Sequence, residues 1–156
     1  MVARIIPVDP FDLVIFGGTG DLARRKILPA LFRRMCDGQM PPEARVIGAA
    51  RSDLDDEGFR AIVREALTEF AGEAASDREM LDPFLSAVGY VQVDAEGEAG
   101  WPDLAGRMRD DAVRAFYFSV GPSLFQPLAG KLTAHGIATP ESRIVVEKPF
   151  GHDLAS

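Results

Sequence analysis

Short apolar runs alternate along the chain with longer segments in which apolar residues recur at helical spacing. The apolar runs are rich in Val, Ile, Phe and Tyr, residues that pack well on a buried, pleated surface. The predicted strands cover residues 11–16, 45–50, 88–93, 113–120 and 142–147. Strands that alternate with helices in this way are typical of an α/β domain, with a mostly parallel, doubly wound sheet and helices on both faces.

The segments between the runs carry the helical pattern. The first has apolar residues at i, i+3, i+4 and i+7, which are Leu28, Leu31, Phe32 and Met35. Pro29 lacks an amide donor and therefore predicts a kink or an irregular first turn, and Asp37-Gly38 predicts the end of this helix. Further helices are predicted over residues 55–71, 77–87, 102–110 and 123–135.

Composition narrows the class of protein. The chain has 156 residues, 47% hydrophobic and 26% charged, which fits one globular domain over residues 1–156 with residues 1–10 as an N-terminal extension. No run approaches the roughly 20 apolar residues that span a bilayer, so no membrane partner is expected. The net charge of −7 argues against a general nucleic-acid binder. The single cysteine, Cys36, forms no internal disulfide and favours the cytoplasm.

A glycine-rich segment follows the first predicted strand directly. It reads Gly17-Gly18-Thr19-Gly20-Asp21-Leu22-Ala23, in which Gly18, Gly20 and Ala23 match the spacing G-x-G-x-x-G/A. In this pattern the first glycine allows a tight turn, the second lets a pyrophosphate approach the backbone, and the third small residue lets helix and strand pack closely. The following helix N-terminus attracts an anion. Its place between a strand and a helix predicts a Rossmann-like dinucleotide-binding site.

The end of the second predicted strand bears on the choice of dinucleotide. An NAD site usually has an Asp or Glu there, which accepts hydrogen bonds from the ribose 2′-hydroxyl. Here Arg51 stands near that position, and a guanidinium pairs well with a 2′-phosphate, so NADP is favoured. Asp53 leaves NAD as an alternative. If the carboxylate of Asp53 faces the ribose in place of Arg51, the cofactor without the 2′-phosphate is favoured.

The fifth predicted strand ends in Glu147-Lys148-Pro149-Phe150-Gly151. Ligands of open α/β sheets bind at the carboxyl ends of the strands, so Lys148 is predicted to lie where substrate and nicotinamide meet.

The sequence contains few other candidates for chemistry. Ser119 and Ser123 have no histidine and acid at triad spacing, and no Cys/His spacing predicts a metal site.

Four segments occur in a specific order: GGTGDLARRKILPALF, GAARS, FYFSVGP and RIVVEKPFGHDL. Together they resemble the coenzyme domain of glucose-6-phosphate dehydrogenases over the whole chain after the first ten residues. The resemblance implies a dinucleotide loop over residues 17–23 and a 2′-phosphate contact from Arg51. It also implies that Asp94 and Ala95 line the cofactor site, and that Lys148 contacts both substrate and cofactor.

The resemblance further implies a reaction of the pentose phosphate pathway, hydride transfer from C1 of glucose 6-phosphate to NADP. The family's catalytic histidine lies in a motif like RIDHYLGKE, which this sequence lacks, and neither His135 nor His152 matches it. No catalytic residue is therefore predicted here. Residues 152–156 resemble a first helical turn, which predicts a truncated connection to an absent α+β substrate domain. In the family that domain carries most of the sugar-phosphate site and the subunit interface of a homo-oligomer.

Two alternatives remain at this point. A family resembling glucose–fructose oxidoreductase also joins a glycine loop to an E-K-P segment, although that segment usually lies nearer the N-terminus. The other alternative is a nucleotide-binding module that performs no chemistry. Titration with NADP followed by an assay of glucose 6-phosphate oxidation distinguishes a binding domain from an active enzyme.

Overall fold

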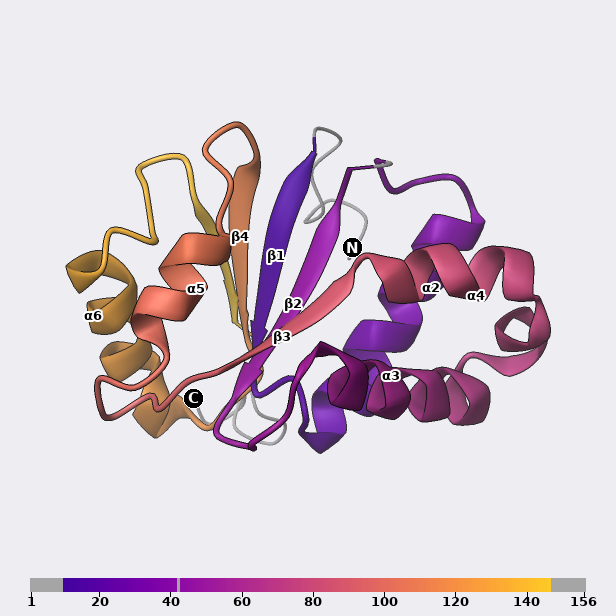
Figure 1. The fold of residues 1–156 in the computed structure, drawn as a ribbon, viewed down its shortest axis with the longest axis horizontal. Helices are drawn as coiled ribbons and strands as arrows, with labels where there is room; N and C mark the ends of the chain where they lie inside the picture. The colour runs from indigo at the N-terminus through magenta and orange to yellow at the C-terminus, as the bar shows by residue number, and fades with distance from the viewer. Residues whose placement is uncertain (1–9, 42, 147–156) are drawn as a thin grey trace, which may run out of the picture.

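A five-stranded sheet forms the centre of the domain in the computed structural model, which describes residues 10–41 and 43–146 (Figure 1). The strands are β1 (Phe11–Phe16), β2 (Arg45–Ala50), β3 (Val88–Gln92), β4 (Val113–Phe118) and β5 (Arg143–Val146). Their order is β3-β2-β1-β4-β5, and every neighbouring pair is parallel. The chain thus winds outward in both directions from β1, which confirms the predicted doubly wound α/β fold.

Helices cover both faces of this sheet. They are α2 (Leu28–Cys36), α3 (Asp56–Phe70), α4 (Arg78–Ser86), α5 (Trp101–Arg107) and α6 (Phe125–Ala134), with 3-10 turns over Gly72–Ser76 and Pro122–Leu124. On one face Phe32, Phe59 and Phe84 belong to the core that α2, α3 and α4 build with the sheet. On the other, Trp101 and Leu128 bring α5 and α6 onto it. Alternate residues of β1, β2, β3 and β4 enter the two cores, as the pleat requires, whereas Ile144 and Val146 of the edge strand β5 are exposed.

The strand predictions are confirmed except near the ends. β3 ends at Gln92, one residue before the predicted end, and β4 ends at Phe118, two residues before it. The amide of Ser119 still donates to the carbonyl oxygen of Phe16 at 2.9 Å, after which the chain turns away into the 3-10 turn that starts at Pro122. Residue 147, the predicted last residue of the fifth strand, lies outside the described residues.

The first helix has the irregular start that Pro29 predicts. A π-helical turn covers Ala23–Ile27, and the amide of Leu28 donates to the carbonyl oxygen of Ala23, five residues back. Pro29 then stands in the first turn of α2, where a missing amide is tolerated best. The helix ends at Cys36, and Gly38 adopts a left-handed φ of +72°, as predicted for its C-terminus.

A buried carboxylate ties the amino ends of the strands together. Asp12 of β1 is completely buried and forms ion pairs with Arg45 (Nε to Oδ1, 3.0 Å) and Arg109 (Nη2 to Oδ1, 2.7 Å). The Arg109 amide also donates to Asp12 Oδ2 at 2.8 Å, so α5 ends at Arg107 instead of continuing to residue 110 as predicted. Burial by itself raises the pKa of Asp12, but the hydrogen bonds from Arg45 and Arg109 outweigh it and hold the pKa below its usual value.

Candidate dinucleotide-binding site

The glycine loop joins β1 to the first helix through a tight turn. Gly17 has a φ of +82°, and its amide donates to the carbonyl oxygen of Ala49 in β2 at 2.8 Å. The Gly20 amide closes the turn by donating to the Gly17 carbonyl oxygen at 2.9 Å, and the Arg24 amide donates to the Gly20 carbonyl oxygen at 3.1 Å. The loop therefore passes directly into a helix whose first amides point to the carboxyl end of the sheet.

The structural roles of Gly17 and Gly18 differ from the predicted ones. The left-handed residue is Gly17 and not Gly18, so the residue before the motif makes the tight turn. A Cβ on Gly17 would also lie 2.3 Å from the carbonyl oxygen of Ser119. Gly18 serves close packing instead, since a Cβ there would lie 3.0 Å from the Cα of Gly48 in β2.

Gly20 and Ala23 lie where the loop meets the start of the first helix. A Cβ on Gly20 would lie 3.2 Å from the Gly17 carbonyl oxygen, a tight contact, and would meet no other atom within 4 Å among the described residues apart from its chain neighbours. Ala23 is completely buried where the helix packs on the sheet. Backbone amides in front of a helix start are groups that can bind a pyrophosphate.

The other predicted loop residues contribute unequally. Thr19 is half-buried within the turn, and the Asp21 carboxylate is exposed and accepts a hydrogen bond from Arg25 Nε at 2.9 Å. The side chain of Leu22 packs against the core, so only its backbone is available to a ligand on the outside. The loop thus offers a ligand mainly backbone groups.

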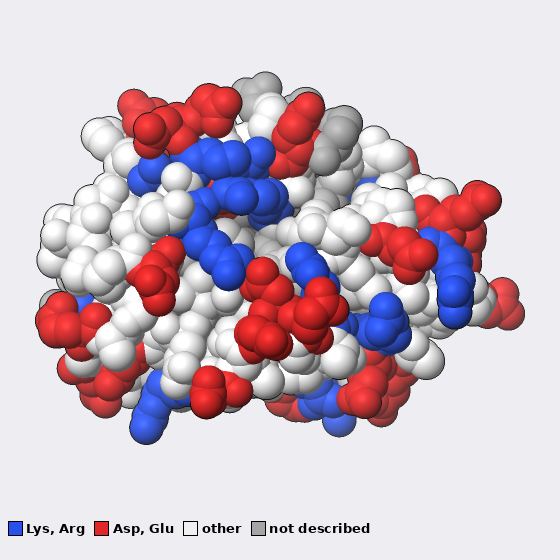
Figure 2. All heavy atoms as spheres, viewed as in Figure 1, with Lys and Arg blue, Asp and Glu red and all other residues white. Residues whose placement is uncertain are grey.

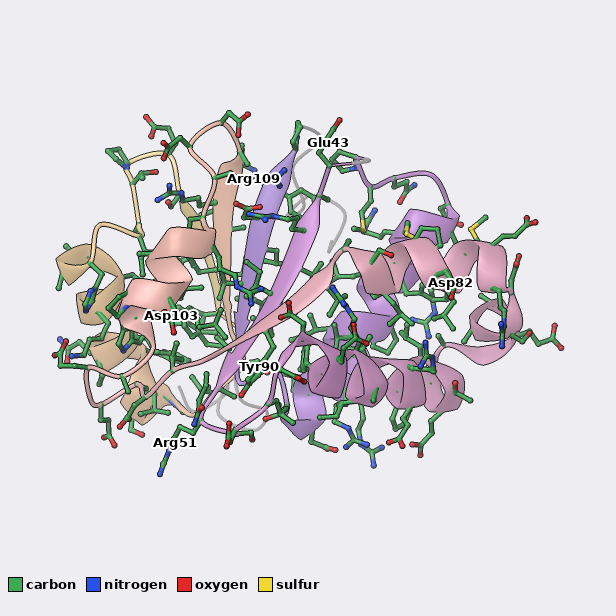
Figure 3. All side chains as sticks on the ribbon, viewed as in Figure 1. Glu43, Arg51, Asp82, Tyr90, Asp103 and Arg109 are labelled. Carbon is green, nitrogen blue, oxygen red and sulfur yellow. The ribbon has the colours of Figure 1, made fainter. Side chains whose placement is uncertain are left out.

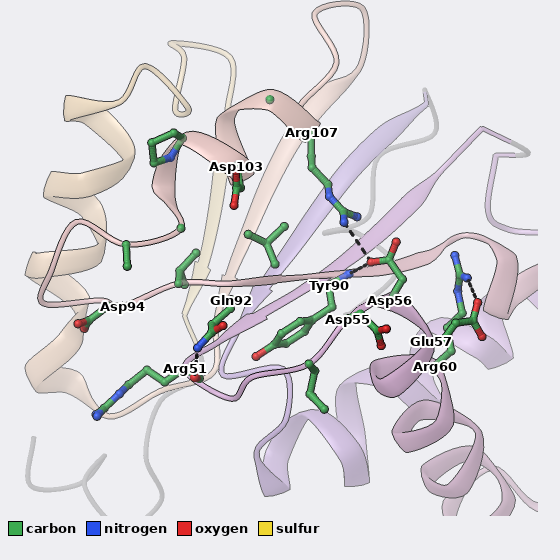
Figure 4. A pocket seen from close by; sticks show the side chains of 17 residues that line it. Arg51, Asp55, Asp56, Glu57, Arg60, Tyr90, Gln92, Asp94, Asp103 and Arg107 are labelled. Carbon is green, nitrogen blue, oxygen red and sulfur yellow. Dashed lines mark hydrogen bonds and ion pairs between the residues drawn. The ribbon is translucent and has the colours of Figure 1, made fainter.

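Arg51 lies immediately after β2, at the same end of the sheet as the loop (Figure 3). It is exposed, and its guanidinium makes no hydrogen bond or ion pair with any described residue. Figure 4 shows its side chain extending outward beyond the end of the strand. A cation without a partner at this position is available to pair with an anionic ligand.

Two side chains of β3 hold the backbone around Arg51, and the sequence did not single them out. The Tyr90 hydroxyl donates towards the carbonyl oxygens of Ala50 and Ser52 at 3.0 and 2.7 Å, and Gln92 Nε2 donates to the Arg51 carbonyl oxygen at 3.0 Å (Figure 4). Burial, with a smaller contribution from the charge of Asp53, raises the pKa of Tyr90, so the phenol stays a donor at neutral pH. Their place on the strand beside β2 is the only sequence signal that points to them.

Asp94 and Ala95 follow β3 at the same end. The carbonyl oxygen of Asp94 accepts a hydrogen bond from Trp101 Nε1 at 2.9 Å, and its Oδ1 accepts one from the Glu96 amide at 3.0 Å. Ala95 is partly buried against the core below α5 and α6. The segment is thereby fixed next to the end of β2.

An open cavity of about 1300 Å³ runs along β3 between the start of α3 and α5 (Figure 4). Arg51, Tyr90 and Asp94 line one end, and Asp56 and Arg107, which form an ion pair of 3.1 Å, line the other. No residue of the glycine loop lines this cavity. It therefore lies beside the loop and meets the expected site only where Arg51 and Asp94 stand.

One further polar group at this end escaped the sequence reasoning. Ser119 follows β4 directly, and its hydroxyl is buried without a hydrogen-bond partner among the described residues. In the sequence Ser119 is a candidate only as a nucleophile, and the signal that points to a binding role is its position at the carboxyl end of a strand. Glu147 and Lys148, the residues predicted to contact substrate and cofactor, lie outside the described residues.

The described part of the chain shows neither a metal site nor a membrane span. No three His, Cys, Asp or Glu side chains in residues 10–41 and 43–146 are grouped to hold a metal ion. None of the helices in those ranges has the length and apolar character to cross a membrane. The site offers backbone amides, a cation and a hydroxyl, which suit an anionic organic ligand.

A parallel sheet wound in both directions from β1, with a glycine loop between β1 and the first helix, defines a dinucleotide-binding Rossmann domain. The family model described as "Glucose-6-phosphate dehydrogenase, NAD binding domain" matches residues 14–156. The chain belongs to this family. It is the coenzyme-binding domain of a glucose-6-phosphate dehydrogenase.

Similar proteins support this assignment. The chain is 46% identical over 158 residues to glucose-6-phosphate 1-dehydrogenase of Rhizobium meliloti, covering 100% of this chain and 32% of that protein. It is 46% identical to the enzyme of Mycolicibacterium smegmatis over 96% of this chain and 32% of that one. The crystal structure of glucose-6-phosphate 1-dehydrogenase from Mycobacterium avium superposes with a TM-score of 0.82 at 32% identity, over 96% of this chain and 32% of that chain.

A glucose-6-phosphate dehydrogenase solved in complex with its substrate glucose 6-phosphate superposes with a TM-score of 0.78 at 34% identity. The superposition covers 94% of this chain and 32% of that chain. The chain therefore spans about a third of the length of the relatives that it matches. Membership of the family decides against the first alternative, the family resembling glucose–fructose oxidoreductase.

Proposed function

We propose that this domain binds NADP, with the pyrophosphate on the glycine loop of residues 17–23 and the 2′-phosphate on Arg51. The observation that carries the proposal is the guanidinium of Arg51 at the end of β2, the strand next to the loop, which has no partner in the part of the chain that the structure describes. A dinucleotide whose pyrophosphate lies at the start of the first helix extends its adenosine half towards β2. The 2′-phosphate then meets a cation that pairs with no carboxylate among residues 10–41 and 43–146.

The residues near Arg51 fit this ligand. Tyr90 and Gln92 fix the turn that presents the arginine, and Asp94 and Ala95 close the same edge after β3. The cavity beside the loop leaves room for an adenine ring at the end that Arg51 and Tyr90 line. The carboxylate of Asp53 is the competing feature, because it favours an unphosphorylated ribose.

As part of the longer enzyme, we propose that the domain presents NADP for oxidation of glucose 6-phosphate at C1, giving 6-phosphogluconolactone in the cytoplasm. The bound nicotinamide supplies the hydride acceptor. The loop orients the pyrophosphate, Arg51 selects the phosphorylated ribose, and Lys148 contacts substrate and cofactor. The solved relative that carries glucose 6-phosphate supports this choice of substrate.

The cofactor assignment is tested by titrating NADP and NAD into the wild-type chain and into Arg51→Ala. A hydrogen bond to a charged group contributes about 1.5–3 kcal/mol, so we expect NADP affinity to fall roughly 10- to 100-fold. NAD affinity should change less than about threefold. The matched control is Arg78→Ala, which removes an exposed arginine at the start of α4, away from the loop. Equal losses for both cofactors in Arg51→Ala would contradict the proposal.

Catalysis is tested separately. We propose that the chain alone binds NADP without turning over glucose 6-phosphate, because no residue in it matches the catalytic histidine of the family. The absorbance of NADPH is followed with saturating substrate and the purified domain. Binding without turnover supports a coenzyme domain, whereas steady turnover at a rate proportional to the concentration of the domain would show that the base lies within these residues.

A further inference from the structure

Ser119 lies against the glycine loop at the point where β4 leaves the sheet. Its amide donates to the carbonyl oxygen of Phe16, the last residue of β1, at 2.9 Å. Its own carbonyl oxygen lies 2.3 Å from the place that a Cβ on Gly17 would occupy. Ser119 is thus a wall of the crevice between β1 and β4, the point from which the sheet is wound in opposite directions.

The hydroxyl of Ser119 is the unusual feature of this wall. It is buried and makes no hydrogen bond, and it is the one such side-chain atom among residues 10–41 and 43–146. Buried polar side chains nearly always have a partner, so an orphaned hydroxyl needs an explanation. The Tyr90 hydroxyl, at the other side of the loop, has two carbonyl partners. The residue Ser119 as a whole is only half-buried, so rotation about χ1 can bring its hydroxyl to the crevice.

The strand order indicates which part of a dinucleotide would meet this hydroxyl. β2, which presents Arg51, and β4, which presents Ser119, lie on opposite sides of β1. With the 2′-phosphate at Arg51 and the pyrophosphate at the glycine loop, the remaining half of the molecule extends over β4. That half is the nicotinamide riboside, whose ribose hydroxyls and amide both accept and donate hydrogen bonds.

We propose that the Ser119 hydroxyl forms a hydrogen bond with the nicotinamide riboside half of the cofactor, so that Ser119 is a further residue that positions the reactive end of NADP. The inference rests on the proposed function, because it takes its orientation from Arg51 and the loop. It adds a contact on the side of the loop where none of the described residues had been assigned one. The ligand supplies a partner for a hydroxyl that has none among the described residues.

The experiment compares Ser119→Ala with the wild-type chain by calorimetric titration of two ligands. NADP reaches both sides of the loop, whereas adenosine 2′,5′-bisphosphate has no nicotinamide riboside. We expect Ser119→Ala to weaken NADP about 2- to 10-fold, the usual effect of one neutral hydrogen bond, and to leave the bisphosphate affinity unchanged. The melting temperature of the free domain should stay the same or rise, because the substitution removes an unsatisfied buried group.

Two control variants make the outcomes distinct. Ser123→Ala removes an exposed hydroxyl in the neighbouring 3-10 turn and should change neither affinity. Arg51→Ala should weaken both ligands. Unchanged NADP affinity in Ser119→Ala overturns the inference, and so does an equal loss for both ligands or a lower melting temperature without a loss of affinity. If the wild-type domain bound neither ligand, the proposed function would fail first and this inference with it.

Discussion

The two ends of the sheet differ in whether key polar side chains have hydrogen-bond partners. At the amino end, the buried Asp12 carboxylate takes hydrogen bonds from Arg45, Arg109 and the Arg109 amide. At the carboxyl end, the Arg51 guanidinium and the Ser119 hydroxyl have no partner among the described residues. Figure 3 shows Arg109 and Arg51 at opposite ends of the strands. Saturated polar groups stabilise a fold, whereas unsatisfied ones are available to a ligand.

A visible cluster of positive charge lies away from the proposed anion site. Figure 2 shows Lys and Arg side chains gathered on the face near the amino ends of the strands. Arg45 and Arg109 share Asp12, while Arg107 pairs with Asp56 and Arg114 with Asp110. These arginines are already paired with carboxylates, whereas Arg51 at the other end has no side-chain partner among the described residues, which favours Arg51 as the anion receptor.

The largest expected effect is at the amino end. Asp12→Asn removes the charge that two guanidinium groups face, and breaking a buried ion pair from one side destabilises by about 3–5 kcal/mol. Both arginines are partly exposed, with 38% and 28% of their side-chain surfaces accessible, so we expect a loss of about 3 kcal/mol in the free energy of unfolding. Urea unfolding measures it, and NADP affinity of the folded fraction should stay unchanged.

The matched control for this variant is Asp110→Asn. Asp110 also pairs with an arginine, Arg114 at 3.3 Å, but its carboxylate is fully exposed. Surface ion pairs contribute little, so its free energy of unfolding should change by less than about 0.5 kcal/mol. Similar losses in the two variants would show that burial of Asp12 does not set the amino end apart.

The second effect is at the glycine loop. Gly17→Ala places a Cβ at a φ of +82° and 2.3 Å from the carbonyl oxygen of Ser119. Gly38→Ala introduces the same backbone strain at a φ of +72° with nothing within 4 Å. We expect about 1 kcal/mol of destabilisation at Gly38 and at least about 2 kcal/mol at Gly17, together with weaker NADP binding. Equal losses at both positions would mean that β4 does not press against the loop.

Gly17 also shows which features the sequence could predict and which it could not. Strand and helix positions follow from local periodicity, so the fold was predictable, and so was a loop near residues 17–23. Which glycine turns left depends on the approach of β4, a contact between segments about 100 residues apart. The same holds for Ser119, Tyr90 and Asp12, whose roles arise only when neighbouring strands bring them together.

The pH dependence of the free energy of unfolding should also reflect the buried ion pairs at the amino end. Because the folded-state pKa of Asp12 lies below its unfolded value of about 3.9, its contribution is fully present above that pH and is lost as pH falls through the folded pKa. The stability gap between wild type and Asp12→Asn should therefore narrow below about pH 4. Denaturation at stepwise lower pH measures it. A gap that stays constant down to pH 2 would mean that Asp12 carries no depressed pKa.

The smallest effect links the fold to the site. Tyr90→Phe removes the hydroxyl that bonds to the carbonyl oxygens of Ala50 and Ser52, on either side of Arg51. The ring stays buried in the core, so we expect a loss of only about 1 kcal/mol in unfolding free energy.

If these bonds hold Arg51 in place, Tyr90→Phe should also weaken adenosine 2′,5′-bisphosphate about two- to threefold, and NADP by the same factor. That pattern differs from the one expected for Ser119→Ala, which weakens NADP and leaves the bisphosphate affinity unchanged. A stability loss with both affinities unchanged would show that Tyr90 serves only the core. Gln92 and the backbone would then hold Arg51 in place, because Gln92 Nε2 donates to the Arg51 carbonyl oxygen independently of the Tyr90 phenol.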